Sequence, residues 1–320
     1  MILVLTEAGE NVGFGHLTRC QAICQNFESK FELVVHADSD IKEEGLRIYP
    51  WRNNLGELLA QYFDVQLVLV DSYLVGIEDY FFLKEQVKWL FVIDDYDRLN
   101  YPCDGLINPA ISGPSYFNSI AKTVLSGPEW VVLRKEILSS EIKDKHGDLR
   151  QICIILGGSD KADLAEAISK KLCKLNFSVT FISGNDSNVA SYNKLLDCEK
   201  VKVYGRLSGD RLAELFTASD LVVSAGGQTL NELAFLGVPF IVIQTGVDQF
   251  NNVNGFVQHG VSPKHLCSND ENLIEQLSQL LIDLTPPLKR AALSQKGKEL
   301  IDGSGAKNIA FKIDELVKYP

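Results

Sequence analysis

The sequence predicts an α/β protein with two doubly wound, Rossmann-like domains and a cleft between the domains. The chain has 320 residues, which suits two domains of about 150 residues each. Short aliphatic and β-branched runs alternate with longer stretches of helical periodicity, and this rhythm restarts after residue 150. Runs that are apolar on both faces and separated by helices are typical of parallel strands. Open sheets of this kind bind ligands at the carboxyl ends of their strands, so functional residues are expected there.

The runs with the strand pattern fall into two sets. In the first half they cover residues 2–5, 31–36, 65–71 and 89–94. In the second half they cover residues 151–156, 178–183, 201–204, 220–225 and 239–243. Near the end of the chain, residues 272–283 and 306–319 place apolar side chains three and four positions apart, which predicts two helices.

A charged stretch between the two sets predicts the domain boundary. Residues 139–150 have the sequence "SSEIKDKHGDLR" and contain almost no apolar side chain, which is typical of a linker. We therefore expect a first domain over residues 1–145 and a second domain over residues 146–320. The last helix is able to cross back to the first domain.

Composition argues against several classes of function. The formal net charge is −11, with 31 basic against 42 acidic residues, so a nucleic acid is not an expected partner. No apolar run approaches the roughly 20 residues of a membrane span, and "MILVLTEAGE" lacks a signal-peptide pattern. We therefore expect no stable membrane insertion and a cytoplasmic location. The seven cysteines are odd in number and several lie in apolar runs, which predicts buried thiols in a reducing compartment and no metal site.

The stretch "DLVVSAGGQTLNELAFLGVPFIVI" predicts a strand, a tight glycine turn, a helix from about Thr229 and a second strand. Glycines at such a turn let backbone amides approach a phosphate, and the helix N-terminus favours its negative charge. A diphosphate site here would use the residues in and beside the turn, which are Ser224, Gly226, Gly227, Gln228, Thr229 and Glu232. Glu232 would accept hydrogen bonds from the ribose hydroxyls. The alternative is purely local, because "TLNE", Thr229 to Glu232, is also the pattern of a capping box.

Two further polar segments follow strands of the second half. "TGVDQFNNVNGF" offers the amides of Gln249 and Asn252, which suit sugar hydroxyls and acyl groups. A polar turn with an asparagine cap explains the same segment equally well. "GGSD", residues 157–160, either binds phosphate or turns the chain and caps a helix.

The stretch "NVGFGHLTRC" follows the first strand and predicts a glycine loop that opens a helix. Gly13 and Gly15 permit a tight loop, and His16 lies in the first helical turn. The positive potential of a helix N-terminus disfavours imidazolium, so we expect a neutral His16 that is available as a base. Arg19 lies on the same helix face, where it can hold a phosphate or orient a carboxylate. The alternative is that His16 is a cap or a packed side chain.

Two strand ends of the first half carry further polar side chains. Asp71 and Tyr73 lie at the end of the third run, and Asp94 and Asp95 lie at the end of the fourth. Either pair can be catalytic, or can cap the next helix, as acidic residues at such positions often do.

Six motifs occur in a characteristic order: "GFGHLTRC", "VDSY", "IDDYDRLNYPCDGLINP", "LSGPEWVVLRKEI", "ILGGSD" and "SAGGQTLNELAFLGVPFIVIQTGVDQFNN". Together they resemble the GT-B-fold hydrolases that act on UDP-2,4-diacetamido-2,4,6-trideoxy-β-L-altropyranose in pseudaminic acid biosynthesis. These hydrolases are themselves similar to MurG-type N-acetylglucosaminyltransferases. The resemblance covers nearly the whole chain and implies the GT-B fold.

The resemblance also implies a role for each matching residue. His16 matches the base that activates water for attack on the anomeric carbon, which releases UDP with inversion. "SAGGQT" matches the diphosphate site, and Glu232 matches the residue that holds the ribose. The residues that would face the sugar or line the cleft are Tyr73, Gln249, Asn252 and Arg134. The resemblance implies a UDP-sugar substrate, a UDP product and no metal or other cofactor, because arginine, amides and helix termini can stabilise the leaving UDP.

Three functions remain open at this point. The first is hydrolysis of a UDP-sugar, with His16 deprotonating water. The second is an inverting glycosyltransferase that has the same donor site and uses a hydroxyl acceptor in place of water. The third is a nucleotide-sugar-binding protein without turnover. The acidic composition, without a basic amphipathic segment, favours the hydrolase over a membrane-docked transferase. The oligomeric state stays open.

Overall fold

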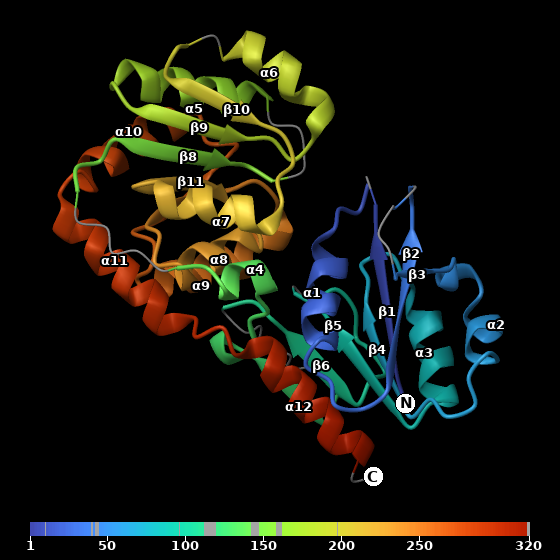
Figure 1. The fold of residues 1–320 in the computed structure, drawn as a ribbon. Coiled ribbons are helices and arrows are strands. Elements are labelled where there is room, and N and C mark those ends of the chain that lie inside the picture. The colour runs from blue at the N-terminus through green and yellow to red at the C-terminus, as the bar shows by residue number, and fades with distance from the viewer. Residues whose placement is uncertain are drawn as a thin grey trace. The chain divides into compact units, whose positions relative to one another are not determined.

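The computed structural model describes residues 1–9, 11–39, 41, 45–95, 97–111, 120–141, 147–157, 162–196 and 198–318. The chain divides into two compact units (Figure 1): unit 1 is Met1–Arg134 with Gly303–Pro320, and unit 2 is Lys135–Asp302. Each unit holds one parallel sheet with helices on both faces, which confirms the predicted α/β fold with two Rossmann-like halves. The predicted boundary between residues 145 and 146 lies outside the described residues.

The described strands of unit 1 form a parallel sheet in the order β3-β2-β1-β4-β5-β6-β7. The strands are β1 Ile2–Ala8, β2 Phe31–Ala37, β3 Arg47–Ile48, β4 Leu67–Asp71, β5 Trp89–Ile93, β6 Gly105–Asn108 and β7 Thr123–Ser126. β1 lies between β2 and β4, and Thr6 of β1 is in register with Asp71, the last residue of β4. The strands predicted in this half are confirmed, and β3, β6 and β7 are additional short strands.

Helices cover both faces of the unit 1 sheet. They are α1 Gly15–Cys24, α2 Leu55–Leu59, α3 Ile77–Gln86 and α12 Gly305–Lys318, with 3₁₀ turns at Trp51–Asn53 and Pro128–Trp130. Ile2 and Val4 of β1 pack with α1 and α12, whereas Leu3 and Leu5 pack with α2 and α3 on the opposite face. Figure 1 shows α1 and α3 on either side of this sheet. Side chains that alternate between two buried faces explain why the strand is apolar throughout.

α12 completes unit 1 although it comes from the far end of the chain. Ile309 and Ile313 are fully buried in the same core as α1. The carboxylate of Asp314 accepts hydrogen bonds from the backbone amides of Glu28 (2.8 Å) and Ser29 (3.0 Å), in the loop after α1. Both apolar burial and a specific polar contact therefore fix this helix on the sheet.

The described strands of unit 2 form a second parallel sheet in the order β10-β9-β8-β11-β12-β13. The strands are β8 Gln151–Ile155, β9 Ser178–Ile182, β10 Val201–Tyr204, β11 Leu221–Ala225, β12 Phe240–Gln244 and β13 His265–Cys267. The helices are α4 Lys135–Leu138, α5 Ala162–Lys174, α6 Val189–Leu195, α7 Gly209–Ala218, α8 Thr229–Phe235, α9 Phe250–Gln258, α10 Leu273–Asp283 and α11 Pro287–Leu300, with 3₁₀ turns at Asp186–Asn188 and Val247–Gln249. The strands and the two C-terminal helices predicted from the sequence are confirmed; β13 and α11 are additional elements.

The core of unit 2 also has two sides. Ile152 and Ile154 of β8 pack with α5 and α10. In a different part of the unit, Phe240 of β12 meets Phe256 of α9 edge to face, with ring centroids 5.3 Å apart. None of the helices in the described part of the chain has the length and the apolar character that a membrane crossing requires.

A substitution at Gly305, the first residue of α12, can test how closely this helix packs against the rest of unit 1. A Cβ atom at Gly305 would lie 2.1 Å from the carbonyl oxygen of Val131, and backbone cannot move aside as a flexible side chain does. We expect Gly305→Ala to lower the free energy of unfolding by about 1–3 kcal/mol, measured by urea denaturation. Gly147→Ala is the matched control, because no described heavy atom lies within 4 Å of the Cβ position there. An equal loss in both variants would contradict this explanation.

Candidate functional site

The start of α1 and the end of β4 bring His16 and Asp71 together in unit 1. β1 and β4 are neighbours in the sheet, and α1 follows the loop after β1. His16 Nδ1 lies 2.7 Å from Asp71 Oδ1, and the Asp71 side chain has no exposed surface. A buried carboxylate in this position holds the proton of the neutral imidazole on Nδ1. The Nε2 atom is then the nitrogen that can accept a proton.

Arg19 lies one helical turn after His16 and bridges two carboxylates. Its Nε donates to Asp71 Oδ2 (2.8 Å) and its Nη2 donates to Asp71 Oδ1 (2.7 Å), a bidentate charge-assisted pair. Its Nη1 donates to Asp95 Oδ1 at 2.7 Å. Of the two roles predicted for this arginine, the contacts favour the orientation of a carboxylate.

Tyr73 closes a ring of contacts. Its hydroxyl donates to Asp95 Oδ2. Its aromatic ring stands perpendicular to the imidazole of His16, with centroids 4.4 Å apart. The contacts therefore run from His16 through Asp71, Arg19, Asp95 and Tyr73 back to His16, and we call these five residues the histidine cluster. The imidazole is held both through Nδ1 and by an aromatic neighbour, which restricts its rotation.

The charges of the histidine cluster correct the expectation that the helix keeps His16 neutral. Burial lowers the pKa of His16, but the negative charge of Asp71 and its hydrogen bond raise that pKa more, so the net shift is upward. Arg19 opposes this increase and Asp95 adds to it. Two carboxylates and one guanidinium leave an excess negative charge that a proton on the imidazole neutralises. The contribution of the helix N-terminus is smaller than that of this direct contact.

Two other members of the histidine cluster have strongly shifted pKa values. Burial acts to raise the pKa of Asp71, yet the charges of Arg19 and His16 hold that pKa well below its usual range. Burial also raises the pKa of the Tyr73 hydroxyl far above its usual value, and the negative charge of Asp95 adds to this increase. These shifts favour the ionised form of Asp71 and the protonated, hydrogen-bond-donating form of Tyr73.

Sequence reasoning did not single out Glu7, which supports the histidine cluster from β1. Its buried carboxylate accepts hydrogen bonds from the Ser72 hydroxyl (2.6 Å) and the Tyr73 backbone amide (2.9 Å). It thereby fixes the turn after β4. The signal in the sequence is one acidic residue inside the apolar run "LVLTEA". Of the strand-end acids, Asp94 stays outside the cluster and accepts the backbone amide of Arg98 (2.7 Å).

The predicted glycine loop before α1 is present and is closed on itself. Gly9 and Gly13 exchange two backbone hydrogen bonds of 3.0 and 2.9 Å. The Oδ2 atom of Asp38 accepts the amides of Asn11 (3.0 Å) and Val12 (3.2 Å). No described heavy atom lies within 4 Å of a Cβ position at Gly15, so the space beside the start of α1 is open.

In unit 2 the predicted glycine turn joins β11 to α8, and two side chains hold it. Gln249 Oε1 accepts hydrogen bonds from the amides of Gly226 (3.1 Å) and Thr245 (2.9 Å). Asn252 Nδ2 donates to the carbonyl oxygens of Gly226 (3.0 Å) and Gly227 (3.3 Å). The turn is therefore tied to the segment that follows β12.

The two glycines of this turn are glycines for different reasons. A Cβ atom at Gly226 would lie 2.3 Å from Val253 Cγ2 and 2.9 Å from Gln249 Cβ, so the packing of α9 requires a glycine. At Gly227 no described heavy atom lies within 4 Å of the Cβ position. The open side of Gly227 is a place where a ligand can approach the backbone closely.

The capping-box alternative for Thr229 and Glu232 is wrong. Gln228 occupies the N-cap position and Thr229 is already the first residue of α8, whereas the box needs its threonine at the cap. Glu232 lies one turn into the helix and is 1 % exposed. Ser224 is also buried, and its hydroxyl donates to the carbonyl oxygen of Ala225 (3.0 Å).

Two further predictions concern other parts of the chain. Arg134 is the last residue of the first segment of unit 1; it is half-buried and is not a member of the histidine cluster. Of the "GGSD" motif only Gly157 is described, and residues 158–160 lie outside the described residues.

Within the described part of the chain, no group of three or more His, Cys, Asp or Glu side chains is arranged to hold a metal ion.

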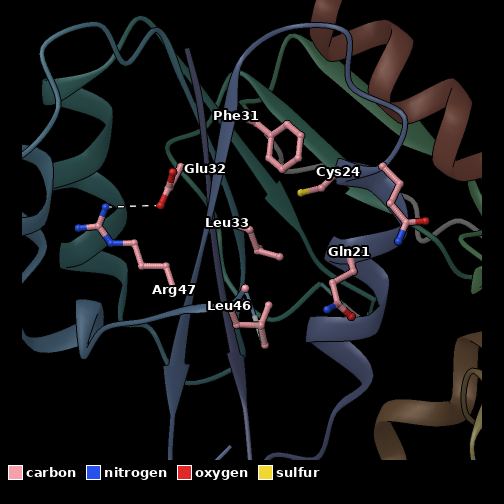
Figure 2. A pocket seen from close by; sticks show the side chains of 9 residues that line it. Gln21, Cys24, Phe31, Glu32, Leu33, Leu46 and Arg47 are labelled. Atoms are coloured by element: carbon pink, nitrogen blue, oxygen red, sulfur yellow. Dashed lines mark hydrogen bonds and ion pairs between the residues drawn. The ribbon is translucent and has the colours of Figure 1, made fainter. Parts of the chain in front are cut away.

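Unit 1 also contains a cavity of about 360 Å³ that shares α1 with the histidine cluster but none of its residues (Figure 2). Gln21 and Cys24 line it from the second half of α1, and Leu46 lines it from the segment before β3. Its acidic and basic side chains, Glu32 and Arg47, pair with each other at 3.5 Å. The residues that line this cavity include no histidine, whereas the histidine cluster holds a buried imidazole against a carboxylate, so we place the candidate site at the histidine cluster.

Comparison with known proteins gives both a domain match and relatives. Residues 152–310 match the Glycosyltransferase family 28 C-terminal domain. An uncharacterized protein of Methanocaldococcus jannaschii is 26% identical over 275 residues, which are 76% of this chain and 55% of that protein. The pseudaminic acid cytidylyltransferase and UDP-2,4-diacetamido-2,4,6-trideoxy-beta-L-altropyranose hydrolase of Helicobacter pylori is 25% identical over 288 residues, which are 87% of this chain and 52% of that protein. The chain thus spans about half the length of these curated relatives.

A solved structure has the same architecture. MurG of Acinetobacter baumannii aligns with a TM-score of 0.67 at 13% identity, over 98% of this chain and 99% of its own. At this identity the likeness concerns the fold. The chain therefore has the GT-B fold, and its residues 152–310 are similar to a glycosyltransferase domain.

Proposed function

We propose that this protein hydrolyses a UDP-linked sugar at the anomeric carbon and releases UDP and the free sugar with inversion. The observation that carries the proposal is the pair of His16 and Asp71, a buried imidazole whose Nδ1 contacts a carboxylate at 2.7 Å. This pairing leaves Nε2 to take a proton from an attacking oxygen. One base that acts on the face opposite the leaving group suits an inverting displacement.

In this proposal unit 1 supplies the base and holds it in place. Arg19 is engaged by Asp71 and Asp95, so it positions the base rather than binding a phosphate. Tyr73, whose ring contacts the imidazole, is proposed to face the reacting sugar. Gly15 leaves room for the substrate, and Arg134 is proposed to contact it.

Unit 2 is proposed to bind the UDP part of the substrate. The residues assigned to the diphosphate are those of the turn, Ser224, Gly226, Gly227, Gln228 and Thr229, and Glu232 is assigned to the ribose. Gln249 and Asn252 are assigned to the sugar. Asn252 supports this assignment through its position, because its Nδ2 contacts the carbonyl oxygens of Gly226 and Gly227 and thereby lies at the turn.

The sugar is proposed to be of the diacetamido-trideoxy class, used in nonulosonic acid or surface polysaccharide biosynthesis. The name of the Helicobacter pylori relative supports this choice. The second candidate function is an inverting UDP-sugar glycosyltransferase, which the match of residues 152–310 to a glycosyltransferase domain favours. In both reactions His16 has the same role, and they differ in whether water or a sugar hydroxyl loses the proton.

The first prediction from the proposed function concerns His16 itself. Purified protein incubated with a panel of UDP-sugars should release UDP without any acceptor, and His16→Ala should lower that rate by about 10²–10⁴-fold because the general base is lost. A coupled assay for free UDP gives the rate. His259→Ala, at the exposed end of α9, is the matched control and should retain the wild-type rate. UDP release that depends on an added acceptor would rule out the hydrolase and favour the transferase.

The second prediction concerns the pH dependence. The neutral imidazole is the active form, so the rate should rise with pH as His16 loses its proton. Because Asp71 raises the pKa of His16, the midpoint of this rise should lie above about 6.5, the ordinary histidine value. Asp71→Asn removes the negative charge, so the midpoint should move to lower pH. The plateau rate should fall by up to about 10⁴-fold, because the imidazole loses its fixed tautomer.

The pH–rate profiles of the wild type and Asp71→Asn provide this measurement. Asp94→Asn is the control, since Asp94 also follows a strand of unit 1 but contacts the amide of Arg98. Its midpoint should match that of the wild type. An unchanged midpoint in Asp71→Asn would show that the titrating group is not His16.

The third prediction concerns the turn of unit 2. Gln249→Ala removes the oxygen that accepts the amides of Gly226 and Thr245, so the turn loses its fixed geometry. The Kd for UDP, measured by isothermal titration calorimetry, should rise about 10-fold, which corresponds to ~1.4 kcal/mol. Gln258→Ala removes an exposed glutamine from the other end of α9 and should bind UDP like the wild type. If all three proteins bound UDP with equal affinity, the turn would not be part of the UDP site.

A further inference from the structure

Two of the cysteines lie in contact in unit 2. The expectation of buried thiols is confirmed for Cys20, Cys24, Cys103 and Cys153, whereas Cys173 and Cys198 are half-buried and Cys267 is exposed. Cys173 is in the last turn of α5 and Cys198 precedes β10. Their Sγ atoms are 2.7 Å apart, although 25 positions separate them in the sequence. Both side chains are half-buried, whereas the paired positions Cys20 and Cys24 on α1 are fully buried. The contact therefore lies where a small oxidant in solution can reach it.

The surroundings shift the pKa values of the two thiols in opposite directions. The hydrogen bond between the two sulfur atoms, the backbone amide of Lys200 and the charge of Lys200 lower the pKa of Cys198. Burial and the same hydrogen bond raise the pKa of Cys173. Thiolates, not thiols, attack oxidants and disulfides. The lowered pKa favours Cys198 as the side chain that reacts first, and the 2.7 Å contact places Cys173 where it can resolve the product.

The backbone around the contact is already fixed in a geometry that suits a cross-link. The amide of Val179, the second residue of β9, donates to the carbonyl oxygen of Lys200 at 2.8 Å. The amide of Phe177 donates to the carbonyl oxygen of Leu172 at 3.1 Å. The first bond joins the segment after Cys173 to the segment after Cys198, and the second closes the turn at the end of α5. Because the Sγ atoms already lie 2.7 Å apart, they need to approach by only about 0.7 Å to reach the length of a disulfide bond.

We propose that Cys173 and Cys198 form a reversible disulfide that clips the end of α5 to the start of β10. The Cys198 thiolate attacks a hydroperoxide, so that a sulfur–oxygen bond forms, the peroxide bond breaks and water or an alcohol leaves. The Cys173 sulfur then displaces the oxygen of the resulting sulfenic acid, which leaves as water with the Cys173 proton. In total two thiols lose two electrons and the hydroperoxide gains them. A dithiol reductant reverses the reaction by thiol–disulfide exchange.

The position of the two cysteines predicts that the disulfide affects the stability of unit 2 and not the reaction at the proposed site. Cys173 and Cys198 precede β9 and β10, at the amino ends of these strands. The glycine turn at Gly226 and Gly227 follows β11, at the carboxyl end of its strand. In a parallel sheet these are opposite edges. The disulfide should therefore stabilise unit 2 without entering the proposed UDP site, and the inference does not depend on the proposed function.

The test treats the full chain with hydrogen peroxide and then measures intact mass, free thiols and linked tryptic peptides. The wild type should lose two thiols and the mass of two hydrogen atoms, and a peptide pair containing Cys173 and Cys198 should appear. Its unfolding midpoint should be higher than that of the reduced protein by on the order of 5–10 °C. Dithiothreitol should restore the original mass and midpoint.

Cys173→Ser and Cys198→Ser should show neither the linked peptide nor the shift in midpoint. Cys267→Ser is the matched control, because it removes an exposed thiol outside the pair, and it should behave like the wild type. In the reduced state all variants should unfold near the wild-type midpoint, which verifies that they fold. Oxygen addition at Cys198 without a linked peptide, or thiol loss that requires Cys267, would overturn the proposal.

Discussion

The carboxylate of Asp71 is fully buried, and its charge is stabilised there by contacts with Arg19 and His16. Removing one partner of such a buried pair typically costs about 3–5 kcal/mol, because the other charge is left without compensation. The start of α1 and the end of β4 are therefore held together by these charged contacts in addition to apolar packing. The histidine is located by an interaction that also stabilises the fold, so stability and the orientation of the base cannot be changed independently.

The glycine turn of unit 2 is organised on a different principle. Neutral side-chain amides from the segment after β12 satisfy the backbone groups of the turn, and Gln249 and Asn252 supply them. These hydrogen bonds hold the turn in place without a ligand, and such preorganisation reduces the entropy lost on binding. The two glycines of the turn differ in the space beside their backbone. Side chains of the α9 segment fill the space beside Gly226, whereas the space beside Gly227 is open.

The sequence predicted those elements and side-chain properties that neighbouring residues determine, and it failed for those that depend on contacts between distant residues. Long runs such as β1 and β11 are apolar on both faces and were predicted, whereas the two residues of β3 and the three of β13 carry too short a pattern. His16 and Arg19 were predicted together because they share a helix face. The pKa shift of His16 was predicted with the wrong sign, since it depends on Asp71, 55 positions away. The capping box failed for a related reason: its four-residue pattern was present, but the helix begins with the threonine already inside it.

The last helix, α12, affects the order in which the two units can finish folding. Unit 2 is one continuous segment, Lys135–Asp302, inserted between the two segments of unit 1. During synthesis unit 2 can assemble its sheet as soon as it leaves the ribosome, whereas the face of unit 1 that contains Ile2 and Val4 stays uncovered until residues 303–320 follow. Contacts between the two ends of a chain form late, because their loop must close first. The half that is made first is therefore the half that finishes folding last, and an interrupted chain would leave the base-bearing unit with an exposed apolar face.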